Sequence, residues 1–86
     1  MAHVNVKLLG LLRLDTGLHE LEANAERVRD LYPLLLEKAH EAKPDTTITS
    51  ADIDGCIVLI NGAQCNKNTK LENDDTVYLM SPVCGG

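Results

Sequence analysis

The sequence predicts a small α+β domain, a sheet with one main helix packed on one face. Three observations support this class. Segments of alternating apolar and polar residues lie near both ends of the chain, one segment of helical period lies between them, and the 86 residues allow one domain. The hydrophobic share of 44% is enough for a core, so the chain is not a disordered acidic tail.

The first two predicted strands form a hairpin. Residues 3–9 alternate between apolar and polar side chains, and residues 19–23 alternate again. Asp15-Thr16-Gly17 lies between them as a turn signal. Residues 11–14 are apolar enough to continue the first strand past Gly10.

The main predicted helix lies within residues 26–43 and ends at Lys43-Pro44-Asp45. Proline is tolerated in the first turn of a helix but not deep inside one. Pro33 therefore favours a start at residues 28–30, with Asp30 as the cap, over an earlier start with a kink. The apolar residues recur at steps of three and four: Val28, Leu31, Leu35 and Ala39.

An irregular polar loop is predicted for residues 46–54. The compact apolar run 56–60 follows as a buried strand, and it ends in Asn61-Gly62, a strong signal for a tight turn. After a polar stretch, Leu71 is an isolated apolar anchor before the turn-like residues 72–75.

The last predicted strand is residues 76–80. Because successive side chains alternate between the faces of a sheet, Val77 and Leu79 are predicted to face the core. Tyr78 and Met80 then point the other way, which makes them candidates for a partner interface. The predicted order is strand, strand, helix, strand, strand.

Composition argues against nucleic acid and membranes as partners. The chain has no Trp or Phe, and Lys plus Arg total 8 against 13 for Asp plus Glu, a net charge of −5. Binding of single-stranded nucleic acid typically needs aromatic platforms and a basic groove. The N-terminus lacks the layout of a signal peptide and no apolar run approaches the length of a membrane span, so we expect a cytoplasmic protein.

The cysteines and histidines predict no metal site. Cysteine occurs three times without a C-x-x-C pair, which signals neither zinc nor a disulfide framework. We expect Cys56 to pack in the core and Cys65 to be a loop thiol. The histidines do not converge with a carboxylate or a thiol, and we expect surface positions for all of them: His3, His19 and His40.

The chain ends in Gly85-Gly86, six residues after the last predicted strand. A chance Gly-Gly end occurs in roughly one chain in two hundred. The short distance between the last predicted strand and the Gly-Gly end is therefore a stronger observation than the two glycines alone. We expect a domain at 1–81 and a flexible tail at 82–86. Glycine has no Cβ and can thread a narrow channel. A partner can join the terminal carboxylate to AMP, and sulfide can then attack the carbonyl to leave a thiocarboxylate.

Residues 71–86, L-E-N-D-D-T-V-Y-L-M-S-P-V-C-G-G, resemble the C-terminal signature of the ubiquitin-like sulfur carriers, closest to the small subunits of molybdopterin synthase. I-V-L-I-N-G at 57–62 is similar to an internal strand of that family, and R-V-R-D-L at 27–31 to its helix start. The resemblance spans essentially the whole chain, loosely before residue 26. Its specific part is the C-terminal signature.

The resemblance implies a β-grasp fold. It implies that a ubiquitin-activating-type enzyme uses ATP to adenylate Gly86, which then becomes the thiocarboxylate. It also implies that the tail threads into the large subunit of molybdopterin synthase, where sulfur passes to a pterin precursor of the molybdenum or tungsten cofactor. The chain itself is expected to bind no cofactor or metal and to have no autonomous catalytic site. The threading residues are Pro82, Val83, Cys84 and Gly85.

Two residues depart from the family pattern, and other functions stay open. Asp74 stands where the family has glycine in a turn, but Asp tolerates left-handed backbone better than most residues. Cys84 stands where a small polar residue is common. We expect it to fill space in a partner channel, the alternative being sulfur exchange. Other recipients are the thiamine thiazole and tRNA. Other functions are a protein modifier joined to lysines through Gly86 and an interaction domain with an incidental Gly-Gly.

Overall fold

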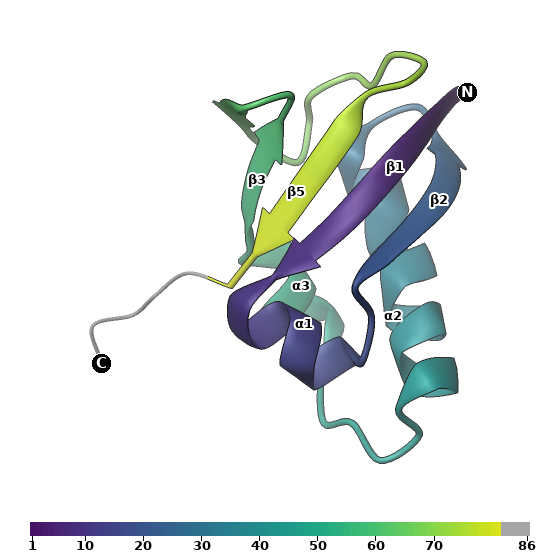
Figure 1. Cartoon of the computed structure of the whole chain (residues 1–86), viewed down its shortest axis with the longest axis vertical. Coiled ribbons are helices and arrows are strands. Elements are labelled where there is room, and N and C mark those ends of the chain that lie inside the picture. The colour runs from purple at the N-terminus through teal and green to yellow at the C-terminus, as the bar shows by residue number, and fades with distance from the viewer. Residues whose placement is uncertain (82–86) are drawn as a thin grey trace.

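The computed structural model describes residues 1–81, which form a mixed five-stranded sheet with helices (Figure 1). The predicted tail at 82–86 lies outside the described residues. The strands are β1 (Ala2–Leu9), β2 (Glu20–Ala25), β3 (Ile57–Ile60), β4 (Ala63–Cys65) and β5 (Thr76–Met80). The helices are α1 (Gly10–Thr16), α2 (Leu31–Ala42) and α3 (Ser50–Asp54), with a 3₁₀ turn η1 (Val28–Asp30) before α2.

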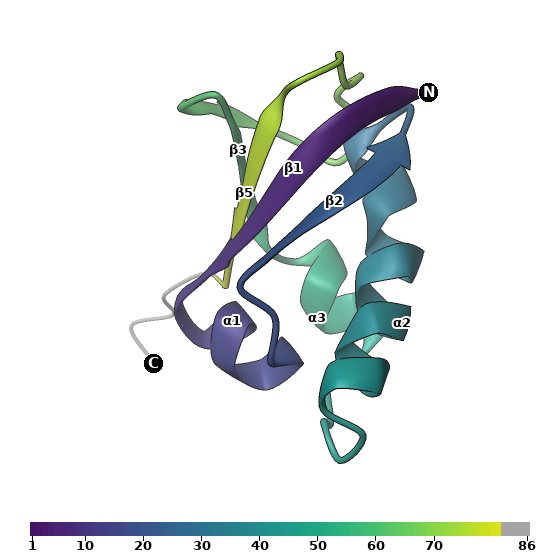
Figure 2. The same cartoon turned by 45° about the vertical axis from the view of Figure 1, so that its right-hand side comes forward.

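The last strand of the chain lies in the middle of the sheet. The strand order is β2-β1-β5-β3-β4, with β1 and β5 parallel and the other neighbours antiparallel. The long helix α2 covers one face, and α1 and α3 lie toward the end of the sheet at which β1 and β5 finish (Figures 1 and 2). This arrangement confirms the predicted β-grasp fold and the antiparallel pairing of the first two strands.

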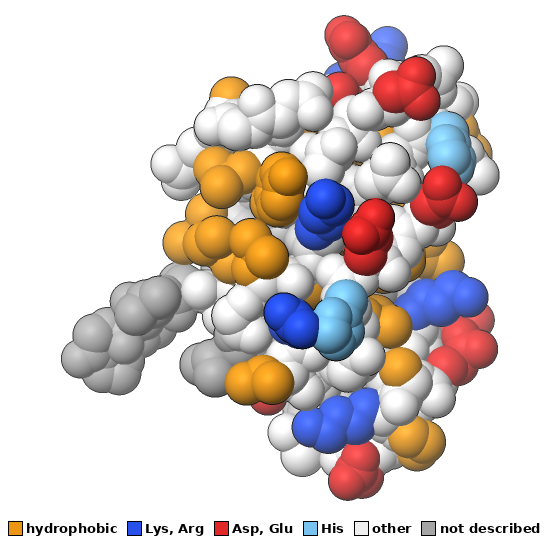
Figure 3. Space-filling view, viewed as in Figure 1, with side chains coloured by type: hydrophobic (Ala, Val, Ile, Leu, Met, Phe, Trp, Pro, Cys, Tyr) orange, Lys and Arg blue, Asp and Glu red, His pale blue; other side chains and the backbone are white. Residues whose placement is uncertain are grey.

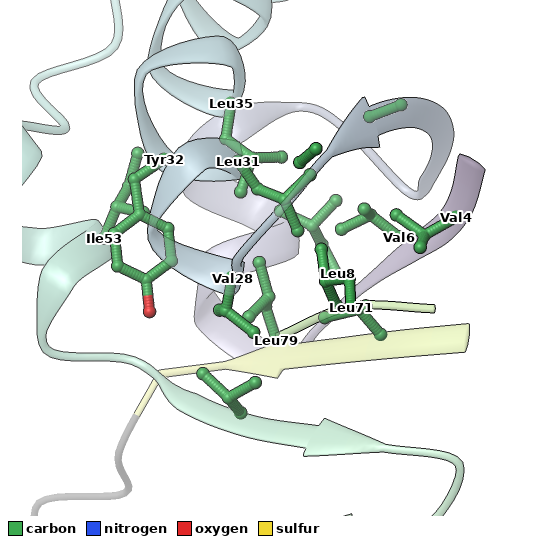
Figure 4. Close-up of a cluster of buried hydrophobic side chains, with 14 of the residues drawn as sticks. Val4, Val6, Leu8, Val28, Leu31, Tyr32, Leu35, Ile53, Leu71 and Leu79 are labelled. Carbon is green, nitrogen blue, oxygen red and sulfur yellow. The ribbon is translucent and has the colours of Figure 1, made fainter. Parts of the chain in front are cut away.

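The core fills the space between the sheet and α2. Val77 and Leu79 are fully buried, which confirms their predicted orientation, and Leu71 is buried as the predicted anchor. Figure 4 shows side chains of η1 and α2 meeting those of the central strands. The labelled members of this cluster are Val4, Val6, Leu8, Val28, Leu31, Tyr32, Leu35, Ile53, Leu71 and Leu79.

Residues 11–14 were predicted to be able to continue the first strand. In the structure they belong to helix α1 instead. Gly10 adopts φ +61°, a left-handed value that breaks the extended chain, and Leu12 turns into the core with 2% of its surface exposed. The buried Thr16 hydroxyl donates to the Leu12 carbonyl at 2.8 Å. Gly17, at φ +70°, ends the helix and donates its N–H to the Arg13 carbonyl.

Residues 46–54 were predicted as an irregular loop, but their last five residues form α3. A reciprocal cap starts this helix. Thr49 Oγ1 accepts the N–H of Asp52 at 3.4 Å, and the N–H of Thr49 donates to Asp52 Oδ2 at 2.9 Å. Ile53 is then buried against the core and holds the helix in place.

The predicted turn at Asn61-Gly62 is confirmed, but the strand after it was missed. Asn61 and Gly62 both have positive φ, at 51° and 91°, as a two-residue hairpin requires. The three-residue strand β4 follows and pairs Cys65 with Val58. Cys65 is therefore not a loop thiol: it ends a strand and packs, half-buried, against the core.

The predicted helix start is confirmed, with one difference at its cap. Pro33 lies in the first turn of α2, where proline is tolerated. Asp30 stands at the N-cap position of α2 but makes no side-chain cap bond there. Its carboxylate instead accepts the N–H of Arg27 at 3.0 Å, so it fixes η1.

The turn at residues 72–75 is also confirmed. Asp74 has φ +70°, so this aspartate tolerates the left-handed conformation, as was expected. Its N–H donates to the His3 carbonyl at 2.8 Å. Asp75 Oδ2 accepts the N–H of Glu72 at 2.8 Å, which closes the turn before β5.

Candidate functional site: the end of β5 and the open sheet face

The C-terminal segment starts from an interior strand that is held on both sides. Met80, the last residue of β5, pairs with Leu9 of β1 and with Ile57 of β3. Ser81 follows directly, and five residues then lead to the C-terminus. Because β5 is paired along both edges, the point at which the tail begins is fixed relative to the body (Figures 1 and 2).

An apolar surface lies beside this point on the face of the sheet that α2 leaves uncovered. Met80 is flanked by Leu9 and Ile57, and Tyr78 is flanked by Leu59 on the β3 side. All these side chains are half-buried. Figure 3 shows hydrophobic side chains gathered over β3 and β5 on this face. We call this set the open-face patch: Leu9, Ile57, Leu59, Tyr78 and Met80.

The other half of the open face is polar. Lys7 pairs with Glu20 of β2 and lies over Tyr78, with its Nζ 5.8 Å from the ring centroid. Asn5 faces Glu22 in the next open-face pair along the same two strands. Polar residues of β1 and β2 therefore bound the open-face patch on one side.

A hollow of about 300 Å³ lies between α1, α3 and the loop before α3, and Ser81 is one of the residues that line it. Two side chains hold this loop against the C-terminal end of α1. Lys43 Nζ donates to the Leu14 carbonyl at 3.3 Å, and Thr46 Oγ1 donates to the Asp15 carbonyl at 2.5 Å. The lining residues are Leu12, Asp15, Thr47, Ile48, Asp52, Gly55 and Ser81.

Cys56 packs against the core, as predicted, and is half-buried. Burial raises the pKa of its thiol to about 11, and an interaction with the Tyr32 hydroxyl lowers that value only in part. Burial likewise raises the pKa of Tyr32. The Cys56 thiol is therefore protonated near neutral pH and is a poor nucleophile there.

The described part of the chain contains no cluster that suggests a metal site. Within residues 1–81 no group of three His, Cys, Asp or Glu side chains is placed to hold a metal ion. The predicted surface positions of the histidines are confirmed, because His3, His19 and His40 are all exposed. In the same part of the chain, no helix combines the length and the apolar character needed to cross a bilayer.

Sequence reasoning identified part of this site. Tyr78 and Met80 point away from the core, as predicted, and their role as an interface remains a prediction. The other members of the open-face patch were missed, because residues 57–60 are apolar throughout and their sequence does not show which of them face away from the core. The predicted site residues of the tail lie outside the described part of the chain: Pro82, Val83, Cys84, Gly85 and Gly86.

Comparison with known proteins gives one family match and several similar structures. The model of the ThiS family matches residues 6–86. Small archaeal modifier protein 1 from Methanosarcina acetivorans is 30% identical, with a TM-score of 0.73 over 100% of this chain and 98% of that one. A putative molybdopterin converting factor, subunit 1, from Pyrococcus furiosus is 24% identical, with a TM-score of 0.69 over 96% and 100%.

A third similar structure is a complex of two proteins. It contains subunits 1 and 2 of the molybdopterin-converting factor from Helicobacter pylori 26695. The matching chain is 24% identical to this one, with a TM-score of 0.61, and the match covers 98% of this chain and 99% of that one. The two matches below 25% identity support the fold alone. No curated protein sequence matches this chain.

Proposed function

The chain belongs to the ThiS family, among the ubiquitin-like sulfur carriers and small protein modifiers, and we propose that it carries sulfur on Gly86 for the synthesis of molybdopterin. One observation supports this most directly. The strand that precedes the Gly-Gly end is held inside the sheet, next to the half-buried open-face patch. A partner that docks on the patch meets the tail at a fixed position.

The chemistry takes place at the terminal carboxylate. One carboxylate oxygen of Gly86 attacks the α-phosphorus of ATP, pyrophosphate leaves, and an acyl-adenylate forms in the partner enzyme. Sulfide then attacks the acyl carbon, AMP leaves with the bonding electron pair, and a thiocarboxylate remains. The partner supplies the cations and the oriented nucleophile.

Docking on the open-face patch would bring two partners to the same surface at different times. The activating enzyme must hold the tail during adenylation, and a synthase subunit must hold it during transfer. The H. pylori structure pairs subunit 1 with subunit 2. We propose a corresponding large subunit as the partner that receives the thiocarboxylate of this chain.

Intact-mass measurement tests the proposal. The chain is incubated with its activating enzyme, ATP and sulfide, and the expected product has one oxygen replaced by sulfur. A chain that lacks Gly86 is the matched control and should keep its mass. An unchanged full-length chain, in the presence of an enzyme that forms the adenylate, would contradict the proposal.

A protein modifier is the second candidate function. The 30% identity to small archaeal modifier protein 1, over the whole of this chain, favours it. In that case the activated Gly86 is attacked by a lysine amine, and an isopeptide bond forms in place of the thiocarboxylate. Adducts of high mass that contain a Gly-Gly remnant on lysine would identify this activity. Sulfur recovered in thiamine thiazole or in tRNA would instead identify another recipient.

A further inference from the structure

We propose that Asn61 is a site of spontaneous deamidation, that the folded chain slows this reaction through two hydrogen bonds of the Asn61 side chain, and that the product weakens the sheet where β5 begins. This reaction is separate from the sulfur-carrier function and does not depend on it. Three observations lead to it: the exposed turn at Asn61-Gly62, the contacts of the Asn61 amide, and the carboxylate of Asp75 beside that amide.

The Asn61-Gly62 turn has the local features that favour deamidation. Asparagine is thermolabile, because the backbone nitrogen of the next residue can attack its side-chain carbonyl carbon. A glycine in that next position has no Cβ to obstruct the attack. Asn61-Gly62 is the one Asn-Gly pair in the sequence, and both residues are exposed. A Cβ added to Gly62 would meet no atom within 4 Å apart from its chain neighbours, so steric crowding does not protect this site.

The reaction exchanges ammonia for water at the side chain. The backbone nitrogen of Gly62, after loss of its proton, attacks Cγ of Asn61 and forms a cyclic succinimide. The Cγ–Nδ2 bond breaks, and Nδ2 takes up a proton and leaves as ammonia. Water then opens the ring at one of its two carbonyl carbons, which gives aspartate or isoaspartate at position 61. In total one water is consumed and one ammonia is released, without an oxidant or a cofactor.

Both polar atoms of the Asn61 side chain are hydrogen-bonded in the folded chain. Nδ2 donates to Asp75 Oδ1 at 2.9 Å, and Oδ1 accepts the N–H of Thr76 at 3.1 Å. These partners fix the orientation of the amide, because a carboxylate only accepts and a backbone N–H only donates. Deamidation removes Nδ2 and turns Cγ toward the Gly62 nitrogen. It therefore breaks the first bond and displaces the acceptor of the second, so both bonds oppose it.

The same two bonds extend the pairing of β3 with β5 by one residue. The regular pairing reaches Ile60 with Val77, so Asn61 and Thr76 are the next residues on the two strands. The Asn61 N–H donates to the Thr76 carbonyl at 3.0 Å. In the other direction the Thr76 N–H is accepted by the side-chain oxygen of Asn61, where φ is +51° and the hairpin turn begins. The side chain therefore supplies a ladder bond at the start of β5.

Deamidation replaces a hydrogen-bond donor with a negative charge. With aspartate at position 61, a carboxylate oxygen takes the place of Nδ2 and faces Asp75 Oδ1, and like charges at such a distance repel. The Asp75 carboxylate is held in place, because its Oδ2 accepts the N–H of Glu72 at 2.8 Å. Isoaspartate adds one atom to the backbone of a turn whose positive φ values fit a two-residue hairpin. Both products therefore loosen the junction of β3 with β5.

The affected contacts lie away from the start of the tail. Figure 1 shows the end of β3 and the start of β5 at one end of the sheet, opposite to the end at which β5 finishes. Thr76 and Met80, the first and last residues of β5, are roughly 13 Å apart. Deamidation should therefore shorten the lifetime of the folded chain without acting on the chemistry at Gly86.

The rate of deamidation tests whether the fold slows the reaction. The folded chain and the same chain unfolded in urea are kept at a mildly alkaline pH, and peptide mapping follows the exchange of NH for O at position 61. Two hydrogen bonds of ordinary net strength predict a rate in the folded chain that is lower on the order of tenfold or more. Equal rates in the two states, or no deamidation of the unfolded chain at Asn61, would overturn the inference.

Two variants separate the hydrogen bonds from a general loss of stability. Asp75→Ala removes the acceptor of Nδ2 and should raise the rate in the folded chain roughly two- to tenfold. Asp74→Ala is the matched control, because it strains the left-handed position at φ +70° without removing a partner of the Asn61 amide. Thermal unfolding checks that both variants are folded. An equal rise in the two variants, or a slower reaction in Asp75→Ala, would contradict the protective role of the bonds.

A reciprocal exchange tests the effect of the product. Asn61→Asp should lower the midpoint of thermal unfolding by roughly 4–8 °C, because it places two carboxylates together. Adding Asp75→Asn to Asn61→Asp restores a donor opposite the new carboxylate and keeps an acceptor for the Glu72 N–H, so most of the loss should be recovered. Asn61→Asp as stable as the unchanged chain, or a double variant no more stable than Asn61→Asp, would refute the weakening of the sheet.

Discussion

Replacement of Met80 by aspartate tests whether the open-face patch guides the tail into its partners. Full burial of a methionine side chain contributes roughly 1.5–3 kcal/mol. Met80 is already half-buried in the free chain, so docking adds only about 1 kcal/mol. A carboxylate without a partner in the same interface costs roughly 1–3 kcal/mol more. Together these terms predict an affinity lower by roughly 30- to 1,000-fold.

Thr76→Asp is the matched control for Met80→Asp. Thr76 lies on the same strand and the same face, at the end away from the tail, roughly 13 Å from Met80. Titration calorimetry against the activating enzyme and against a synthase large subunit gives the two affinities, and thermal unfolding checks both variants for folding. Equal losses in the two variants, or no loss in Met80→Asp, would refute the role of the patch.

The other expected outcomes concern the fold around the site. Leu79→Ala should lower the free energy of unfolding by roughly 2–5 kcal/mol, because Leu79 is fully buried. Leu59→Ala, on the open face, should lower it by less than half as much in the same urea titration. Asp74→Val should cost roughly 1–2 kcal/mol and Asp74→Gly almost nothing, because φ is +70° there; similar denaturation midpoints for the two would contradict this account. Between pH 9 and pH 11 the folded chain keeps the Cys56 proton that the unfolded chain loses. The free energy of unfolding should therefore fall with rising pH more steeply than in Cys56→Ala. Parallel pH profiles of the two chains would refute the burial of the Cys56 thiol.

Long periodic segments made most of the fold predictable. The alternation in residues 3–9 and 76–80 and the three-and-four spacing in residues 28–39 each correspond to a face that the structure buries. Pro33 located the start of α2 correctly because its ring excludes an interior helix position.

Short elements escaped the sequence analysis because their periods are incomplete. Helix α1 has seven residues and begins at a glycine with positive φ, so its apolar residues look like more strand. Helix α3 has five residues, and its signal was the reciprocal cap between Thr49 and Asp52 rather than any periodicity. The strand β4 has three residues and is defined by its partner β3 more than by its own sequence.

The candidate site was predictable in its chemistry but not in its surroundings. The Gly-Gly end and the outward direction of Tyr78 and Met80 follow from local sequence. The position of Ile57 beside Met80 depends on the pairing of β3 with β5, which joins residues far apart in the chain. No local pattern contains that pairing, because the strand order is set by the packing of the whole sheet.

Sulfur transfer by a chain without Gly86 is the most direct test of the central claim. The full chain and the shortened chain are each treated with activating enzyme, ATP and sulfide. They are then mixed with a molybdopterin synthase large subunit and the pterin precursor, and the sulfur content of the pterin is measured. We expect a dithiolene product from the full chain and none from the shortened chain, with identical circular dichroism spectra. Product formed by the folded, shortened chain would contradict the account.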